Sequence, residues 1–209
     1  DEPLSDEEVR DESYILILAG HETTASALSW SFYHLSRNPE VRERLEKEID
    51  EVLGGQPPTP ADYRNLPYAR AVLDETLRLT PSLYIVGRTA LEDCEIGGYH
   101  IPKGTAVQPC WRIPQRSEAH FPEADRFKPE RWLEPQPPDR PKHAYAPFGG
   151  GARHCIGHGY AKMEVVYTLA AVCRRWRLEV ISDQYPEVNS MGNYKMKNGL
   201  PVKLIAREP

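Results

Sequence analysis

One stretch of the sequence, residues 148–157, reads Phe148-Gly149-Gly150-Gly151-Ala152-Arg153-His154-Cys155-Ile156-Gly157. Its glycines tolerate positive φ angles and let the backbone approach a flat ligand closely. Cys155 comes directly before a helix predicted from about Gly157 to Arg174, and the free amide groups at the start of a helix stabilise a thiolate. Arg153 can reach an anionic group nearby. The stretch therefore predicts a loop that presents a thiolate and a cation to one ligand, as a thiolate-ligated haem with carboxylate side chains requires.

The alternative for Cys155 is a buried free cysteine beside a glycine-rich turn. The other cysteines, Cys94, Cys110 and Cys173, form no C-x-x-C pair, and no His-x-x-x-His site accompanies them, so zinc is not favoured. Four cysteines in 209 residues also do not resemble a disulfide framework. These features favour a reducing, cytoplasmic setting.

The spacing F-x-x-G-x-R-x-C-x-G in residues 148–157 resembles the haem-binding signature of the cytochromes P-450 at every fixed position. Gly159-Tyr160-Ala161 and Glu164 continue in the manner of that family. The resemblance implies haem b (iron protoporphyrin IX) as the cofactor and Cys155 as the ligand of its iron. It also implies that Phe148, Arg153 and Gly157 are haem-binding residues.

Glu75 and Arg78 are three residues apart and share one face of a predicted helix, where alone they would form an ordinary surface ion pair. The later segment Phe127-Lys128-Pro129-Glu130-Arg131-Trp132 resembles the family's second arginine motif, with Trp132 where Phe is frequent. The resemblance implies that Glu75, Arg78 and Arg131 lock together in a structural network that holds the Cys155 loop. Planar guanidinium groups suit bidentate pairing with a carboxylate.

The segment Ala19-Gly20-His21-Glu22-Thr23-Thr24 resembles the oxygen-binding segment of the family's long central helix. The resemblance implies that Gly20 opens space above the haem and that Glu22 and Thr23 deliver protons to dioxygen. Thr23 can also bond back to a carbonyl one turn earlier. The alternative is that two threonines are simply tolerated in a helix.

Arg88, in Val86-Gly87-Arg88-Thr89, matches a family arginine that meets the haem propionates, and its alternative is a solvated strand residue. Where relatives read His-Arg-Asp-Pro, this chain has Trp111-Arg112-Ile113-Pro114. The lost polar residue weakens a local turn and puts a haem or meander contact in doubt.

Capping, proline and glycine signals predict helices over Ser5–Ser36, Pro39–Leu53 and Pro67–Thr80. Gly97-Gly98 predicts a hairpin, and Asn198-Gly199 predicts a turn between two strands in a C-terminal hairpin. The fold class is mostly α with small antiparallel β-sheets.

The resemblance covers residues 1–209 as a single partial domain, the C-terminal half of the cytochrome P-450 fold. In chain order it holds the central distal helix, the Glu75 helix, β hairpins, a meander, the cysteine loop, a proximal helix and the C-terminal hairpin. Tyr14–Ala19 is apolar on every side, which predicts burial all round. With the N-terminal half absent, it would lose packing worth about 25 cal/mol per Å², enough to exceed the ~5–15 kcal/mol that stabilises a domain. We therefore expect a fragment, or a chain that pairs with another supplying the first half.

The net charge of −5 is unevenly spread, with acidic residues concentrated in 1–51 and basic residues in 112–162. Two solvated faces explain this, and so does a docking face for an acidic partner. Nucleic acid is not favoured, and no apolar run is long enough for a membrane span. No flavin or nicotinamide motif is present, so electrons come from a redox partner. The residues expected to meet an acidic ferredoxin are Arg112, Arg116, Arg126, Lys128, Arg140, Lys142 and Lys162.

The favoured function is haem-dependent monooxygenation of an apolar small molecule, with a terpenoid as the suggested substrate class and bacterial secondary metabolism as the setting. One alternative keeps the haem and changes the chemistry to that of a peroxygenase or an isomerase. Another is a haem-free, non-catalytic accessory subunit of the same fold. The intact Cys155 and Arg153 argue against the accessory subunit, and the acid–alcohol pair argues against the peroxygenase.

Overall fold

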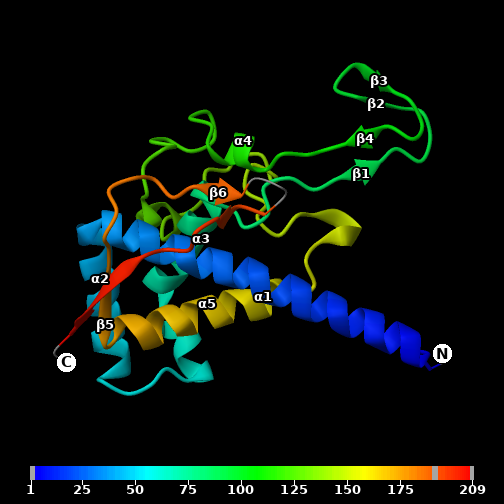
Figure 1. Ribbon diagram of the computed structural model, residues 1–209. Helices are drawn as coiled ribbons and strands as arrows, with labels where there is room; N and C mark the ends of the chain where they lie inside the picture. Colours follow the sequence, from blue (N-terminus) through cyan, green and yellow to red (C-terminus); the bar gives the residue numbers. More distant parts are fainter. Residues whose placement is uncertain (1–2, 190–192, 208–209) are drawn as a thin grey trace.

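The computed structural model describes residues 3–189 and 193–207, and helices dominate it (Figure 1). The four longer helices of this part are α1 (Asp6–Arg37), α2 (Pro39–Leu53), α3 (Pro67–Leu79) and α5 (His158–Cys173). Shorter turns are α4 (Arg112–Gln115), η1 (Pro60–Asn65), η2 (Pro129–Trp132) and η3 (Gly151–Arg153). The predicted helix-rich class with small antiparallel sheets is confirmed. Within the described ranges, no helix is both long and apolar enough to cross a membrane.

The helix boundaries follow from local chemistry. Ser5 and Glu8 form the predicted capping box, in which the Glu8 amide donates to Ser5 Oγ at 3.3 Å and the Ser5 amide donates to Glu8 Oε2 at 2.8 Å. α2 ends at Gly54, which has a φ of 51°, as a left-handed helix cap requires.

The strands form two-stranded antiparallel sheets. β1 (Arg88–Thr89) pairs with β4 (Ala106–Val107), and β2 (Cys94–Ile96) pairs with β3 (Tyr99–Ile101) through the predicted Gly97–Gly98 turn. β5 (Trp176–Val180) pairs with β8 (Val202–Ala206), and β6 (Val188–Asn189) pairs with β7 (Lys195–Met196).

The predicted hairpin around Asn198–Gly199 is wrong in its pairing. A turn is present, and Gly199 has a φ of 70°, but the strands on its two sides have other partners. β7 returns to β6, whereas the Pro201 carbonyl accepts from the Ile181 amide at 3.3 Å and leads β8 onto β5. A turn signal predicts local geometry only. Here β7 pairs with the preceding strand β6, and β8 pairs with the more distant β5.

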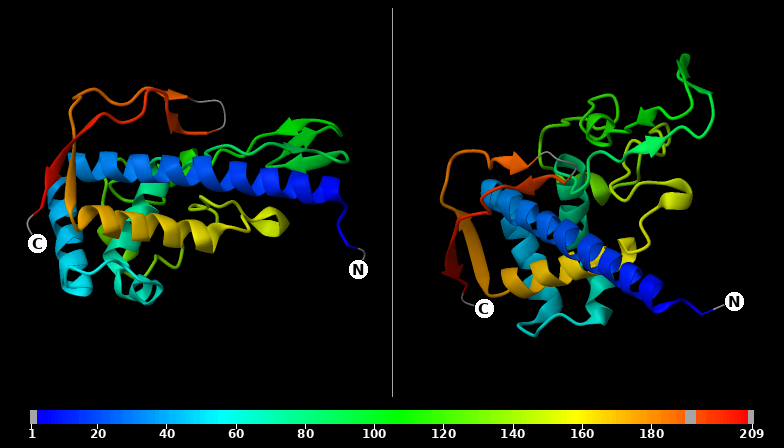
Figure 2. Two further views of the ribbon diagram at one scale, coloured as in Figure 1. Left: turned by 60° about the horizontal axis from the view of Figure 1, so that its bottom comes forward. Right: turned by 45° about the vertical axis from the view of Figure 1, so that its right-hand side comes forward.

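The main core lies between the second half of α1 and helices α2, α3 and α5. Its fully buried members include Leu45, Ile49, Val72, Val166 and Leu169. Figure 2 shows α5 running beside α1. A smaller cluster forms where Trp30 of α1 packs on Tyr194 and Met196, and this cluster fixes the segment around β7 against α1.

The first half of α1 contributes nothing to this core. Tyr14, Ile15, Leu16, Ile17 and Leu18 are between 58% and 67% exposed. The N-terminal end of α1 extends past α5 (Figure 1). The described chain therefore does not bury this stretch on every side, which is the loss of packing expected from the sequence when the N-terminal half is absent. The helix pattern indicates a buried environment, but burial depends on a layer that packs against it.

His34 of α1 is a buried imidazole that stacks on Phe127 with ring centroids 4.6 Å apart. Its Nε2 lies 3.2 Å from Thr80 Oγ1. Burial lowers the pKa of His34 from 6.5 to about 3, so the folded protein holds the ring neutral.

We predict that His34 makes the protein lose stability as the pH falls from 6.5 towards 3. In this window the unfolded chain binds a proton that the folded chain does not, which costs up to about 1.4 kcal/mol of unfolding free energy for each pH unit. Denaturant unfolding at several pH values should therefore show that the unfolding free energy falls less steeply with decreasing pH in His34→Gln than in the parent. Parallel pH profiles for the two proteins would contradict the assignment.

Candidate active site

A cavity of about 790 Å³ opens between α1, the chain after α3, and the loop before α5. Most of its lining is apolar. From the predicted site residues it collects Gly20, Thr23, Arg88, Phe148, Arg153, Cys155 and Gly157. Glu22, Glu75, Arg78 and Arg131 do not line it. The fold thus brings predicted site residues from α1 and from the loop before α5 into one cavity.

The Cys155 loop owes its shape to glycine and to internal hydrogen bonds. Gly149 and Gly151 have φ angles of 72° and 68°, a region that other residues rarely adopt. The Cys155 amide donates to the Phe148 carbonyl at 3.0 Å and closes the loop. Cys155 is exposed and is a free thiol at the cavity. The loop therefore presents the sulfur to the cavity ahead of α5.

The α1 wall of the cavity is open at Gly20, where an added Cβ would meet no atom within 4 Å. The Thr23 hydroxyl donates to the Ala19 carbonyl at 2.6 Å, and the Thr24 hydroxyl donates to the Gly20 carbonyl at 2.6 Å. A hydroxyl that donates in this way keeps lone pairs that can accept. Thr23 can therefore accept a hydrogen bond from a group in the cavity.

Glu22 is turned away from the cavity. Its carboxylate accepts from Lys195 Nζ at 2.9 Å, and its side chain is 48% exposed. The hydrogen bond from Lys195 lowers the pKa of Glu22, so the group is an ionised carboxylate at neutral pH. The structure does not place Glu22 and Thr23 in the same cavity, although they are adjacent in sequence.

Polar donors at the cavity lack acceptors among the described residues. The Trp111 indole N–H is buried and has no partner there, and Trp111 lines the cavity with Arg88 and Arg153. Arg88 is exposed, and its Nη1 donates to the Gly87 carbonyl at 2.8 Å. A buried donor without an acceptor is costly unless a ligand completes it. A flat, mostly apolar ligand with anionic groups, coordinated by a thiolate, fits this set, and haem is such a ligand.

The unusual segment at residues 111–114 does not lose its turn. Residues 112–115 form α4, and the Gln115 amide donates to the Trp111 carbonyl at 3.2 Å. The expected weakening of this turn is not seen, because the helical turn is held by main-chain bonds and Ile113 faces outwards at 72% exposure.

Glu75 is fully buried and accepts from four residues. Arg78 pairs with both of its oxygens at 2.8 Å, and Arg131 Nε donates to Oε1 at 3.1 Å. The Lys128 amide donates to Oε1 and Trp132 Nε1 donates to Oε2, each at 2.9 Å. Trp132 thus adds an indole donor that phenylalanine at this position would lack.

Gln115 joins this network to the chain just before the Cys155 loop. No sequence pattern around Gln115 predicted this role. It is fully buried, and its Nε2 donates to the carbonyls of Leu77 and Arg78 at 3.0 and 3.1 Å. Its Oε1 accepts from the Ala146 amide at 3.2 Å. The C-terminal turn of α3 therefore holds the residues that lead into the loop.

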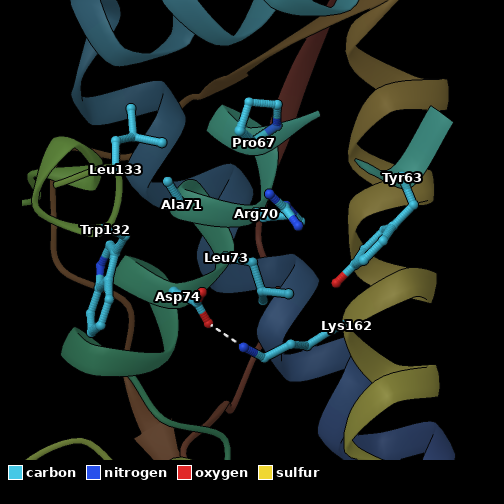
Figure 3. Close-up of a pocket in the computed structure, with 9 residues that line it drawn as sticks. All are labelled: Tyr63, Pro67, Arg70, Ala71, Leu73, Asp74, Trp132, Leu133 and Lys162. Atoms are coloured by element: carbon cyan, nitrogen blue, oxygen red, sulfur yellow. Dashed lines mark hydrogen bonds and ion pairs between the residues drawn. The ribbon is translucent and has the colours of Figure 1, made fainter. Parts of the chain in front are cut away.

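A second, polar cavity of about 180 Å³ is lined by residues of α3, η2 and α5 (Figure 3). Lys162 of α5 and Asp74 of α3 point towards each other there, with 2.7 Å between Nζ and Oδ1. Tyr145 donates to the same Asp74 oxygen at 3.0 Å, and Lys162 Nζ lies 5.8 Å from the centre of the Phe148 ring. The ion pair therefore connects α5 to α3, and Tyr145 and Phe148 connect the chain at the start of the Cys155 loop to the same pair.

The basic residues expected to face a ferredoxin are mostly engaged within the chain. Arg126 and Lys128 pair with Glu123 at 2.8 and 2.6 Å, and Arg116 pairs with Asp125. Lys162 pairs with Asp74. These acids reduce the positive charge that this part of the surface offers to a partner.

We predict that Glu75→Ala destabilises the protein by about 3–5 kcal/mol, because Arg78 would be left as a buried charge without its carboxylate. Chemical denaturation measures the loss. The control is Glu51→Ala, which removes an exposed ion pair with Lys47 and should change the unfolding free energy by less than about 1 kcal/mol. Equal losses in the two variants would show that the buried network contributes no special stability.

Comparison with known proteins shows the family to which the sequence belongs. The family model for cytochrome P450 matches residues 1–204. Cyclooctatin synthase of Streptomyces melanosporofaciens is 42% identical over 178 residues, covering 85% of this chain and 39% of that protein. Cytochrome P450 4V2 of Mus musculus is 38% identical over 208 residues, covering 98% of this chain and 39% of that protein.

A putative cytochrome P450 132 of Mycobacterium bovis is 39% identical over 198 residues, covering 93% of this chain and 42% of that protein. The chain thus spans about two fifths of the length of these curated relatives. Because the family match extends over almost all of the sequence, this chain belongs to the cytochrome P450 family.

Proposed function

We propose that this chain forms the haem-binding part of a monooxygenase that hydroxylates an apolar small molecule with dioxygen and electrons from a redox partner. The observation that carries the proposal is the meeting of a free thiol, two arginines and a threonine hydroxyl in one apolar cavity. Family membership supports haem as the ligand that this cavity takes.

In this proposal Cys155 is the thiolate ligand of haem b. Arg88, Arg153 and the Trp111 indole supply donors for its carboxylate groups, and Phe148, Gly20 and Gly157 give it flat, uncrowded walls. When bound, haem supplies the activation of dioxygen, and a thiolate ligand favours cleavage of the O–O bond. The share of the protein is ligation, orientation and control of water.

The proton-handling groups on α1 are Thr23 and Glu22. Thr23 lines the cavity, and its back-bonded hydroxyl can accept a hydrogen bond from a water there. To hold dioxygen, the hydroxyl would have to turn from the Ala19 carbonyl and donate its proton into the cavity. Glu22 lies on the solvent side and, as an ionised carboxylate, can take up a proton from water. Together they would move protons from solvent to the cavity.

Substrate and partner follow from the walls of the site. The apolar lining and the volume of about 790 Å³ suit an apolar small molecule such as a terpenoid in addition to the haem plane. Electrons would come from a ferredoxin-type protein. Because several basic residues are neutralised by neighbouring acids, its docking would depend on the pattern of charges and not on net positive charge.

We predict that the reduced protein under carbon monoxide shows the absorption maximum of thiolate-ligated haem. Cys155→Ser should abolish this maximum, since a hydroxyl cannot replace the thiolate. Cys94→Ser, which changes an exposed cysteine of β2 outside the cavity, should leave the spectrum intact. Loss of the maximum in both variants, or in neither, would contradict Cys155 as the ligand.

Thr23→Val should raise the fraction of consumed dioxygen that appears as hydrogen peroxide severalfold, because the hydroxyl that guides protons is lost while the shape is kept. Electrode measurement of dioxygen together with a peroxide assay gives this fraction. Thr168→Val is the control, since its hydroxyl makes the same back-bond, to Glu164 at 2.8 Å, outside the cavity. An unchanged peroxide fraction in Thr23→Val would remove Thr23 from the proposed relay.

A further inference from the structure

The carbonyl of Tyr194 is fixed to α1 by two side chains. Trp30 Nε1 donates to it at 2.7 Å and Ser26 Oγ donates to it at 3.0 Å. The Tyr194 amide donates to the Ser82 carbonyl at 2.8 Å, in the chain that follows α3. The two bonds from α1 are buried, so the backbone at Tyr194 is held firmly between α1 and this chain.

The residues on either side of Tyr194 both contact Glu22. Lys195 Nζ lies 2.9 Å from Glu22 Oε1, and Asn193 Nδ2 lies 3.5 Å from Oε2. Asn193 is itself bridged to Leu83, which lines the cavity. Because the backbone between them is anchored, the lysine and the amide reach Glu22 from a fixed base.

The same segment also contacts Thr23. The hydroxyl of Ser82, whose carbonyl holds Tyr194, donates to the Thr23 carbonyl at 2.7 Å. One group of contacts therefore holds the side chain of Glu22 and the backbone of Thr23 together.

The charges that act on Glu22 have one sign. Lys195 is its ion-pair partner, Asn193 is neutral, and His21 on the same helix acts in the same direction as Lys195. The Glu22–Lys195 pair is about half exposed on both sides, so its direct contribution to stability is small. The consequence that matters for the site is the position of the Glu22 carboxylate, which Lys195 holds at 2.9 Å.

We propose that Lys195 is a positioning residue for Glu22, which it holds as an ionised carboxylate at the solvent side of the proton path. This inference rests on the proposed function of Glu22. The carboxylate can then accept a proton from water and pass it inward towards Thr23. Without Lys195 the carboxylate would lose its ion-pair partner and the position that this partner gives it.

The direction of the pH effect follows. Lys195 lowers the pKa of Glu22, so the ionised form is present down to a lower pH than for an unpaired carboxyl. Removing the cation should raise the pKa towards its ordinary value. The acid limb of product formation should therefore move to higher pH in Lys195→Met.

The test compares four variants of the haem-loaded protein: Lys195→Met, Lys195→Arg, Lys197→Met and Glu22→Gln. Lys197→Met is the matched control, because Lys197 follows β7 and pairs with Glu187 at 2.7 Å with similar exposure. Carbon-13 NMR titration of glutamate carboxyls, with the Glu22 signal assigned by its loss in Glu22→Gln, gives the pKa without turnover. Product formed per dioxygen consumed gives the functional effect.

We expect Lys195→Met to raise the pKa of Glu22 and to lower product per dioxygen severalfold, with Lys195→Arg restoring both and Lys197→Met changing neither. If Glu22→Gln impairs coupling but Lys195→Met behaves as Lys197→Met, the inference about Lys195 is wrong and the role of Glu22 stands. If Glu22→Gln leaves coupling unchanged, the proposed proton role of Glu22 fails, and the inference fails with it.

Discussion

The carboxylate of Glu75 joins α3 to the irregular chain at Lys128, Arg131 and Trp132. It is fully buried, and an ionised group in that position is tolerated only when charge and hydrogen bonds surround it. Arg78 supplies the neutralising charge and spends its remaining donors on the carbonyls of Gln115, Ala124 and Arg126. The irregular chain from α4 to η2 is therefore held against α3 through its main-chain carbonyls. Its own apolar cluster is small.

The cavity depends on this arrangement through a short chain of contacts. Gln115 connects the end of α3 to Ala146, and Tyr145 connects Asp74 to the same segment. The loop that begins at Phe148 starts from these fixed points, and positive φ angles at Gly149 and Gly151 give it its turn. The position of the Cys155 sulfur is thus set by polar contacts behind the loop and by backbone conformation within it.

Local signals in the sequence predicted the elements well. The predicted helix over Ser5–Ser36 and the predicted helix over Pro39–Leu53 agree with α1 and α2, which begin after the Ser5 capping box and end before Gly54, respectively. Signals that need a distant partner were less informative. The exposure of Tyr14–Leu18 and the separate pairing of β7 and β8 depend on which layers and strands are present, which local pattern does not state. Gln115, Trp111 and Lys195 were missed for the same reason, because their partners or their orphaned donors appear only in three dimensions.

The central claim is that the thiolate of Cys155 coordinates a haem iron in the cavity. X-ray absorption at the iron edge of the purified haem-loaded protein tests it most directly, because sulfur and lighter atoms in the first coordination sphere scatter differently. The account predicts one sulfur neighbour in addition to the porphyrin nitrogens, and its loss in Cys155→Ser. A coordination sphere of nitrogen and oxygen alone in the parent protein would contradict the account.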